Sequence, residues 1–500
     1  VLLLGGWNEG RAGQAALLMA LFWAVHPLQV SSVLYVVQRM QTLGTLFILL
    51  ALLAYVRMRQ AQMRAAPFRT DALLTLLWAV LAFASKEDAV LLPAYTLALE
   101  LTVLKFAVAD PAWSRRLRAG YAAAVLLGLL VFVFVALPRY WHWDWYPRRE
   151  FSSPERLLTQ GRVLVLYLWQ MLVPWPDSLR FFYDDVEVSR GVLTPWTTLP
   201  AWMCLTGLLV LAWKRRSGMP VFSLGVLLFF FGHALTSNII PLELAFEHRN
   251  HFPLAGVVLA AGDVLRVTFR KLRLPVIMQG IMVIALLGVF GSASAVRAHV
   301  WGDPLRMARH TLELAPRSER AWAFLCSTYF ERSRQRVGSP ELDLAIETCE
   351  RGAEALPESA ILQNNVLVFK TVRGDATQAD WDRVIERLAK VRMSVQNKRI
   401  LWTTLSNVDR GLYDNEESIL RNIDIVSSRS TLRPAEHIRV AAYTFNDMQE
   451  PVKAFPHMKK AVEASRPDDP DILKMFRELR AAGRGDWVER LEQIHGVSGN

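Results

Sequence analysis

The apolar positions of the chain follow two different patterns. Before about Val296 they form long runs, such as LFILLALLAYV and AAAVLLGLLVFVFVAL, which are broken by short polar turns. After Ala298 they recur at helical spacing within charged segments that are separated by prolines. The pattern predicts an all-α protein with a polytopic helical membrane domain over residues 1–297 and a helical domain outside the membrane over residues 298–500.

Nine apolar segments are candidate membrane spans, and several are shorter than the ~20 residues that a bilayer requires, so they would use flanking residues. A tenth apolar segment, 157–173, contains Gln160 and Arg162 and ends at a Pro-Trp-Pro sequence. We interpret it as an interfacial helix, because counting it as a span would invert the topology downstream. The nine segments are 15–25, 42–56, 71–84, 89–104, 119–137, 199–213, 220–236, 253–267 and 275–296.

Basic residues gather in four of the short loops between these segments. The positive-inside rule predicts that all four loops are cytoplasmic. The loops HPLQVSSVLYVVQRM, SKED, 138–195 and IIPLELAFEHRN would then share the outer face with the C-terminal domain. The basic loops contain Arg57, Arg59, Arg64 and Arg69; Arg115, Arg116 and Arg118; Lys214, Arg215 and Arg216; and Arg270, Lys271 and Arg273.

Composition agrees with a lipid bilayer as the main partner, because hydrophobic residues make up 52% of the 500 residues. The net charge of +11 could suggest nucleic acid, but the basic residues lie between apolar segments and no RNA-binding or helix-turn-helix framework is present. We therefore expect no nucleic-acid partner. The chain starts at Val1 and runs directly into an apolar segment, which we interpret as a fragment that lacks an N-terminal part.

One stretch of the C-terminal domain follows the spacing of a tetratricopeptide repeat, with an insertion in the turn SRQRVGSPE. Later segments keep helical periodicity but lose the consensus, so we predict degenerate helical hairpins. They could bind a protein partner or form a structural cap. Two of the repeat positions are cysteines on facing helices, which could be buried thiols or a disulfide. The repeat positions are Trp322, Leu325, Cys326, Tyr329, Ala345, Cys349, Gly352 and Pro357.

The predicted outer loops contain most of the residues that could carry chemistry. His26, Gln38 and Arg39 lie at helix ends, where they could bind a polar headgroup or simply cap and snorkel. Lys86 and Glu87 interrupt an apolar hairpin, which requires either a function or internal ion pairing.

Two further loops combine charged residues with aromatic ones. The stretches PRYWHWDWYPRREF and DSLRFFYDD contain Arg148, Arg180, Asp184 and Asp185 among aromatics, and they could bind a sugar phosphate or form an interfacial aromatic belt. The turn before Phe252 is the densest charged cluster, and we expect it to be functional. It contains Glu243, Glu247, His248, Arg249 and Asn250.

Several common chemistries lack their motifs here. The sequence contains no GxxxxGK[ST], HExxH or GxSxG pattern, which disfavours nucleotide-driven pumping and zinc or serine hydrolysis. No CxxC pair suggests a metal or redox site. We therefore predict no cofactor, and the sequence gives no support for a divalent metal.

Four segments, taken in order, resemble the transmembrane-and-tetratricopeptide O-mannosyltransferase-like family and its bacterial relatives, within the GT-C glycosyltransferase superfamily. They are FWAVHPLQVSSVLYVVQRMQTLGTLF, ASKEDAVLLPAYTLALEL, VLYLWQMLVPWPDSLRFFYDD and IIPLELAFEHRNHFPLAG. The resemblance continues into the repeats. It implies an enzyme of the bacterial inner membrane that transfers a sugar from a polyprenyl-phosphate carrier to a protein or glycan acceptor on the extracytoplasmic face, where the C-terminal domain would also lie.

The resemblance also implies roles for particular residues. The family's key acidic residue usually lies in the first outer loop, which would precede Val1, so only supporting positions are carried over. Asp184 and Asp185 are weaker candidates for a catalytic carboxylate. The positions that match the family's motif regions are Arg39, Lys86, Glu87, Glu247, His248 and Arg249.

Two other functions fit the same sequence. A non-catalytic membrane scaffold could recruit partners through its repeats while the polar loops brace the fold. A surface-polysaccharide polymerase or ligase would differ from the protein glycosyltransferase only in its acceptor. A transporter is disfavoured, because most predicted spans lack charged residues in their centres.

Overall fold

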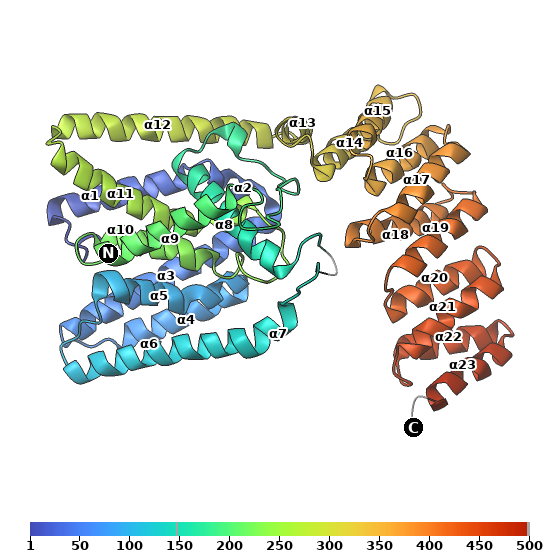
Figure 1. The fold of residues 1–500 in the computed structure, drawn as a ribbon, viewed down its shortest axis with the longest axis horizontal. Helices are drawn as coiled ribbons and strands as arrows, with labels where there is room; N and C mark the ends of the chain where they lie inside the picture. The colour runs from blue at the N-terminus through green and yellow to red at the C-terminus, as the bar shows by residue number, and fades with distance from the viewer. Residues whose placement is uncertain (147–148, 498–500) are drawn as a thin grey trace. The chain divides into compact units, whose positions relative to one another are not determined.

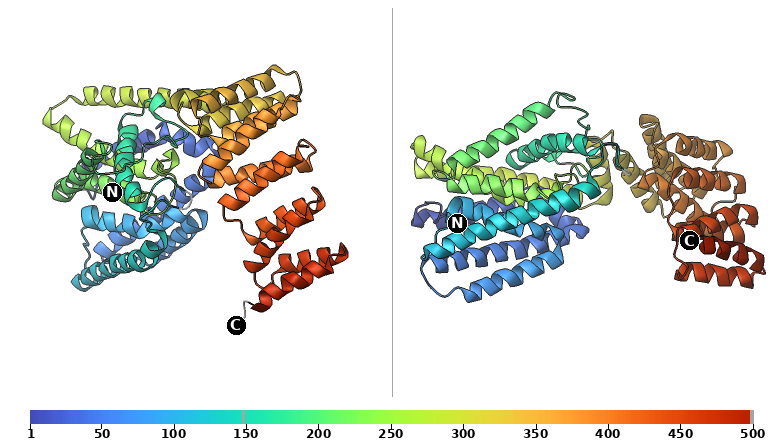
Figure 2. Two further views of the ribbon diagram at one scale, coloured as in Figure 1. Left: turned by 45° about the vertical axis from the view of Figure 1, so that its right-hand side comes forward. Right: turned by 60° about the horizontal axis from the view of Figure 1, so that its bottom comes forward.

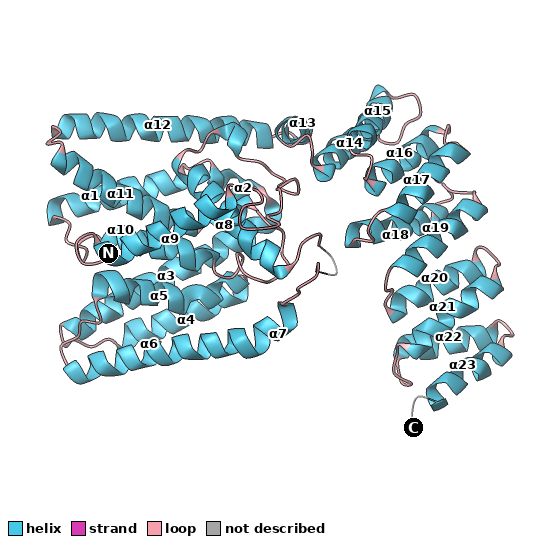
Figure 3. Cartoon of the chain, viewed as in Figure 1, coloured by secondary structure: helices cyan, strands magenta, loops and turns pink. Residues whose placement is uncertain are grey.

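The computed structural model describes residues 1–146 and 149–497. Every regular element within these ranges is a helix, and the one β contact there is an isolated bridge between Gly191 and Thr194. The predicted all-α class is therefore confirmed (Figure 3). The chain divides into two compact units, Val1–Ala321 and Trp322–Asn500, which are described separately below.

Local sequence sets where the helices of the first unit begin. Asn8 accepts a hydrogen bond from Gly10 N at α1, and Ser152 and Glu155 form a capping box at α8. Proline occupies the first turn of α6, α8, α10 and α11, where its missing N–H has no cost. The helices are α1 (Glu9–Ala24), α2 (Leu28–Leu34), α3 (Arg39–Met63), α4 (Arg69–Ser85), α5 (Leu92–Leu99), α6 (Pro111–Val131), α7 (Leu137–Tyr140), α8 (Ser153–Leu172), α9 (Thr198–Arg215), α10 (Pro220–His233), α11 (Pro253–Lys271), α12 (Val276–Trp301) and α13 (Pro304–Leu314) (Figure 1).

Three helical stretches of the described chain are long and apolar enough to cross a membrane: Val36–Met63, Pro111–Tyr140 and Val276–Trp301. The pair α1 and α2, bent by 65°, makes a fourth if it counts as one span. In the most apolar stretches of α6 and α12, none of the residues is buried inside the protein. Each of the nine predicted segments contains a helix, but the other helices do not meet these criteria, so the count of nine spans stays a prediction.

The segment interpreted as an interfacial helix forms α8, which is not among the helices that could cross a membrane by length and composition. Instead it buries polar side chains as well as apolar ones. Tyr167, Arg156 and Gln160 of α8 are all at most 1% exposed. Arg156 donates to the backbone oxygens of Thr236, Asn238 and Leu242, so α8 is fixed to the loop that follows α10.

Glycines allow a close helix crossing in the first unit, between α10 and α11. A Cβ built on Gly225 would lie 2.2 Å from the Gly256 carbonyl oxygen, and a Cβ on Gly256 would lie 2.5 Å from the Gly225 oxygen. Any larger residue would push the two backbones apart, which is the role that small residues play between membrane helices.

One expectation about this unit needs correction. Arg59, assigned to a cytoplasmic loop, lies within α3 and is fully buried, where its Nε donates to Glu100 Oε1 over 2.6 Å. The apolar pattern could not show this point, since it depends on which elements pack together. The first compact unit ends at Ala321 and includes α13, and the predicted division into a membrane domain and an outer helical domain at residue 298 stays a prediction.

In the second unit, helices that are close in sequence pack against one another (Figure 2). Helix α15 packs on α16, α16 on α17, α17 on α19, α20 on α21 and α22 on α23, an arrangement compatible with helical repeats. Ser339, Ser359 and Ser394 cap the helices that follow them. The helices are α14 (Glu319–Ser333), α15 (Pro340–Ala355), α16 (Ala360–Arg373), α17 (Gln378–Lys390), α18 (Val395–Asp409), α19 (Glu416–Arg429), α20 (Pro434–Asn446), α21 (Pro451–Glu463), α22 (Pro470–Ala481) and α23 (Gly485–Val497).

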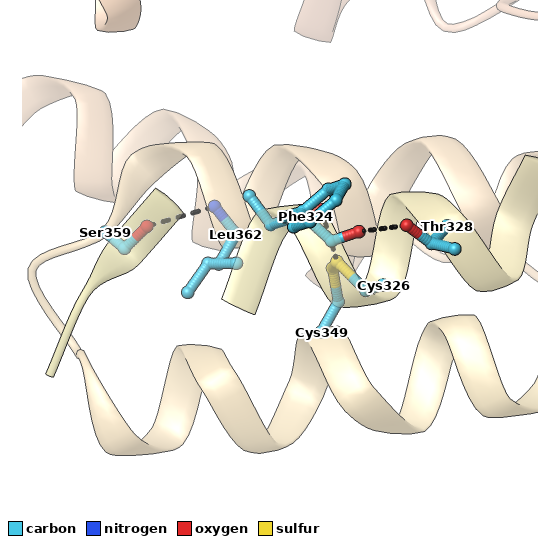
Figure 4. The surroundings of a disulfide bond; sticks show 7 residues. Phe324, Cys326, Thr328, Cys349, Ser359 and Leu362 are labelled. Atoms are coloured by element: carbon cyan, nitrogen blue, oxygen red, sulfur yellow. Dashed lines mark hydrogen bonds between the residues drawn. A yellow bond between two sulfur atoms is a disulfide. The ribbon is translucent and has the colours of Figure 1, made fainter. Parts of the chain in front are cut away.

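A disulfide joins α14 to α15 through Cys326 and Cys349, whose Cα atoms are 5.6 Å apart (Figure 4). Of the two alternatives left open by the sequence, the structure therefore has the bonded one. Both cysteines are fully buried. In α15, a Cβ at Gly352 would lie 3.0 Å from the Trp322 ring, which explains why a small residue stands at this position.

Candidate functional site

The turn EHRN forms a short 3-10 helix, η6 (Glu247–Asn250), directly before α11. Its first side chain, Glu247, accepts hydrogen bonds from the Arg297 guanidinium and, over 3.4 Å, from Tyr183 Oη. Arg297 also donates to the Pro27 carbonyl oxygen over 2.8 Å. Glu247 and Arg297 are 3% and 5% exposed, so this ion pair binds η6, α12 and the start of α2 together away from solvent.

A second polar group surrounds Lys86, at the end of α4. Its ammonium donates to Gln41 Oε1 of α3 and lies 3.8 Å from Asp88 Oδ2, and its side chain is 10% exposed. Burial raises the pKa of the Asp88 carboxyl above its usual range, although Lys86 acts in the opposite direction. The hairpin SKED is thus a folded turn in which the buried cation has both an amide and a carboxylate beside it.

Electrostatics link this turn to η6. Burial, together with the positive charges of Lys86 and Arg249, lowers the pKa of His248 to about 3. Burial and Lys86 also lower the pKa of His251 to about 4. Lys86 and Arg249 therefore act on the same imidazole, that of His248, from segments far apart in sequence. Both imidazoles stay neutral at physiological pH. We call Lys86, Asp88, His248, Arg249 and His251 the basic recess.

Glu243 and Arg249 hold the loop that precedes η6. Arg249 donates to the Glu243 carbonyl oxygen over 2.8 Å, and its guanidinium lies 5.5 Å from the centre of the Phe246 ring. The Glu243 carboxylate is 3.2 Å from Arg149. Burial alone would raise the pKa of Glu243, but the charge and hydrogen bond of Arg149, a backbone hydrogen bond and the charge of Arg249 together outweigh it, and the pKa is lowered. Glu243 is therefore a paired, ionised group.

The three residues predicted to bind a polar headgroup differ in their surroundings. His26 is 1% exposed, bonds to the Met171 carbonyl oxygen through Nε2 over 3.0 Å, and accepts a hydrogen bond from Leu28 N through Nδ1. It therefore caps α2 and braces α8. Gln38 is buried, and its Oε1 has no partner among the described residues. Arg39, in contrast, is exposed at the start of α3, and the described part of the chain places no carboxylate against it.

The DSLRFFYDD stretch forms contacts of its own. Arg180 pairs with Asp185 over 3.0 Å. Asp184 accepts hydrogen bonds from Ser318 Oγ over 2.6 Å and from Arg320 N over 3.5 Å, at the start of α14. Both carboxylates thus have partners in the protein, and neither belongs to the basic recess. Arg148 lies outside the described residues.

The structure therefore brings Lys86, His248 and Arg249 together, while Glu247 lies beside them in a buried ion pair. Glu87 is exposed, and no ion pair to it is found in the described ranges. Sequence reasoning missed Arg297, Gln41, Tyr183 and His251. Arg297 had a readable signal, since a charged residue near the end of an apolar helix is costly unless it has a partner. Asn250, which the sequence places in the same turn, is fully buried, and neither atom of its amide has a partner among the described side chains and backbone.

No group of three His, Cys, Asp or Glu side chains in the described ranges is arranged to hold a metal ion. The recess offers two cations, two neutral imidazoles and one carboxylate, a set suited to holding an anion such as a phosphate. No protein-family model matches the chain, and neither a curated protein nor a solved structure is detectably similar to it.

Proposed function

We propose that the protein is an integral membrane glycosyltransferase of the GT-C type, which transfers a sugar from a polyprenyl-phosphate carrier to a protein or glycan acceptor on the extracytoplasmic face. The observation that carries the proposal is the pair of cations in the basic recess: Lys86 is held by Gln41 and Asp88, Arg249 is held by the Glu243 carbonyl oxygen, and both act on the buried His248 imidazole. The helices α4 and α11 connect this recess to the arginine-rich turns at their other ends, near Arg69 and Arg270. Under the positive-inside rule, the recess then opens on the outer side.

The recess suits the chemistry of this reaction. When the sugar leaves its carrier, negative charge develops on the phosphate, and preorganised cations stabilise that charge. Lys86 and Arg249 would supply these cations, and the neutral His248 imidazole can donate or accept one hydrogen bond. Asp88 and Gln41 hold the Lys86 ammonium in place. Asp184 and Asp185 have structural partners, so the proposal assigns no step to them.

The extracytoplasmic side of the membrane would also contain the C-terminal domain and its tetratricopeptide-like hairpins. The Cys326–Cys349 disulfide supports this location, because disulfides persist in oxidising compartments outside the cytoplasm. In a bacterial inner membrane this compartment would be the periplasm. The hairpins would then lie where a protein or glycan acceptor arrives, and a polysaccharide acceptor would make the enzyme a polymerase or ligase.

The test is transfer of radiolabelled sugar from polyprenyl-phosphate donors by membranes that contain the full chain. Lys86→Gln and Arg249→Gln should each lower transfer by about 100-fold, the typical cost of removing one group that stabilises developing charge. Lys214→Gln removes an equal charge from the last turn of α9 and should leave transfer unchanged. Thermal unfolding of each variant in detergent reports whether it is folded.

The second candidate is a non-catalytic scaffold. One observation favours it: charged residues of the predicted outer loops pair with one another, as in Arg149–Glu243 and Arg180–Asp185. Loops that only stabilise the fold would also need such ion pairs. If the wild-type chain transfers sugar from no donor, while the Lys86→Gln and Lys214→Gln variants capture the same protein partners as the wild type, the scaffold is correct and the glycosyltransferase is not.

A further inference from the structure

A groove with a volume of about 1190 Å³ lies between α1, α11 and α12. In Figure 1 these helices lie together at the upper left, and α1 contacts both of the others. The groove is separate from the basic recess: none of the five recess residues lines it. It therefore requires an explanation of its own.

One end of the groove is basic. Arg11 and Gln14 of the first turns of α1, Arg270 at the end of α11, and Arg273 and Gln279 beside the start of α12 line this end. A fourth arginine, Arg266, pairs with Asp263 over 2.8 Å. No carboxylate in the described part of the chain is within ion-pair distance of Arg11, Arg270 or Arg273, so three exposed positive charges at this end have no counter-charge.

The other end of the groove is apolar. Met19 and Phe22 of α1, Met171 and Leu172 of α8, and Leu286 and Phe290 of α12 line it. The rings of Phe22 and Phe290 meet edge to face with their centres 5.6 Å apart. A ligand that fills the groove must therefore place its anionic part among the arginines and its apolar part toward these rings.

The length of the groove fits one leaflet of a bilayer. Gln279 and Phe290 line its two ends on α12, and at 1.5 Å per residue they are about 16 Å apart along the helix axis. Half of the ~30 Å hydrocarbon core is about the same length. Because α12 is one of the helices able to cross a membrane, its basic end then lies at the headgroup level and its aromatic end near the bilayer centre.

From these observations we infer a specific binding site for an acidic phospholipid from the leaflet that faces Arg11, Arg270 and Arg273, the cytoplasmic leaflet under the positive-inside rule. The phosphate and its net negative charge bind the three arginines, and one acyl chain follows the groove toward Phe22 and Phe290. The inference requires only that α12 spans the membrane, and it does not depend on the glycosyltransferase activity.

The test measures lipid binding to the purified full chain in detergent by native mass spectrometry. The probes are dioleoyl phosphatidylglycerol, dioleoyl phosphatidylcholine, which has the same chains without net charge, and glycerol 3-phosphate, which has no chains. We expect phosphatidylglycerol to bind at least tenfold more tightly than either of the others. The double variant Arg270→Gln/Arg273→Gln should bind it about 30-fold more weakly, at about 1 kcal/mol for each arginine.

The chain offers matched controls for the two features of the site, its arginines and its open groove. Lys271→Gln removes a charge from the same turn, but Lys271 does not line the groove, so binding should persist. A Cβ at Gly280 or at Gly288 meets no atom within 4 Å, but only Gly280 lines the groove. Gly280→Phe should therefore block phosphatidylglycerol, and Gly288→Phe should not.

Three results would overturn the inference. Equal binding of phosphatidylcholine would mean that the arginines do not select the ligand, and equal binding of glycerol 3-phosphate would mean a free-phosphate site. Equal weakening by Lys271→Gln and by the double arginine variant would mean general surface attraction. If Gly280→Phe does not fold, the arginine variants still decide the outcome.

Discussion

Arg297 and Glu247 form an ion pair that joins the end of α12 to η6, and neither side chain is more than 5% exposed. Removing one partner would leave the other charge buried and unpaired. Glu247→Ala and Arg297→Ala should therefore each lower the free energy of unfolding by about 3–5 kcal/mol. The double variant Glu247→Leu/Arg297→Met removes both charges, so it should be more stable than either single variant. Thermal unfolding in detergent measures the difference.

The ion pair Arg180–Asp185 is the control for this prediction. Arg180 is 39% exposed, so Arg180→Ala should cost no more than about 1 kcal/mol. If the double variant at Glu247 and Arg297 is less stable than both single variants, the pair does not act as a compensated buried unit, and its role in fixing η6 is wrong.

The glycine crossing of α10 and α11 gives a second prediction. Gly225→Ala places a methyl group 2.2 Å from the Gly256 oxygen, so the helices must separate, at a cost of about 1–3 kcal/mol or more. Gly207→Ala in α9 is the matched control, since its Cβ meets no atom within 4 Å and should stabilise the helix by about 0.5–1 kcal/mol. Unfolding temperatures measured in one detergent should move in opposite directions, and a shift in the same direction would contradict the close crossing.

The sequence was informative wherever a property belongs to a single segment. Long apolar runs indicated helices at all nine proposed positions, and the spacing of Trp322, Cys326 and Cys349 placed two facing helices correctly. Apolar periodicity depends only on the local 3.6-residue repeat, which is why it could be interpreted without a structure.

Properties that depend on packing between distant segments could not be predicted. Gln41 was not recognised because its role depends on Lys86 reaching it from another helix. Arg59 was assigned to a loop because a run of arginines looks the same whether or not Glu100 lies against it. Asp184 and Asp185 looked like one acidic pair, but they have different partners, Ser318 and Arg180, which are far apart in sequence.

The disulfide gives a third prediction. Cys326 and Cys349 are 23 residues apart, and closing a loop of this length reduces the entropy of the unfolded chain by the equivalent of about 3 kcal/mol at 25 °C. Cys326→Ser/Cys349→Ser should therefore increase hydrogen exchange in α14 and α15. Cys204→Ser is the control, because Cys204 is a free cysteine in α9. Equal exchange in the wild type with and without a reducing agent would contradict the prediction.

Two buried histidines of the second unit make its stability depend on pH. His437 Nδ1 and His457 Nδ1 are 2.9 Å apart, so one ring must donate the hydrogen bond and the other must accept it. Burial, together with the charges of His437 and Lys460, lowers the pKa of His457 to about 4. Burial and Lys460 also lower the pKa of His437, which Glu436 partly opposes. The folded state therefore keeps the pair neutral.

The sign of the effect follows from linkage. An unfolded histidine binds a proton near pH 6.5, whereas folded His457 does so only near pH 4, so the unfolded state binds more protons between these values. The stabilisation is complete above about pH 6.5 and is lost as the pH falls toward 4, by roughly 2 kcal/mol. Hydrogen exchange of α20 and α21 in the intact chain, corrected for the intrinsic rate at each pH, measures this loss.

His457→Phe separates the histidine pair from other acid effects. The phenyl ring cannot bind a proton, so the change in protection of α20 and α21 between pH 6.5 and pH 4 should fall by at least half. The helices α15 and α16 contain no histidine and serve as the internal reference in the same experiment. An equally steep loss of protection in the variant would place the pH dependence on other groups, such as the Lys398–Glu436 ion pair.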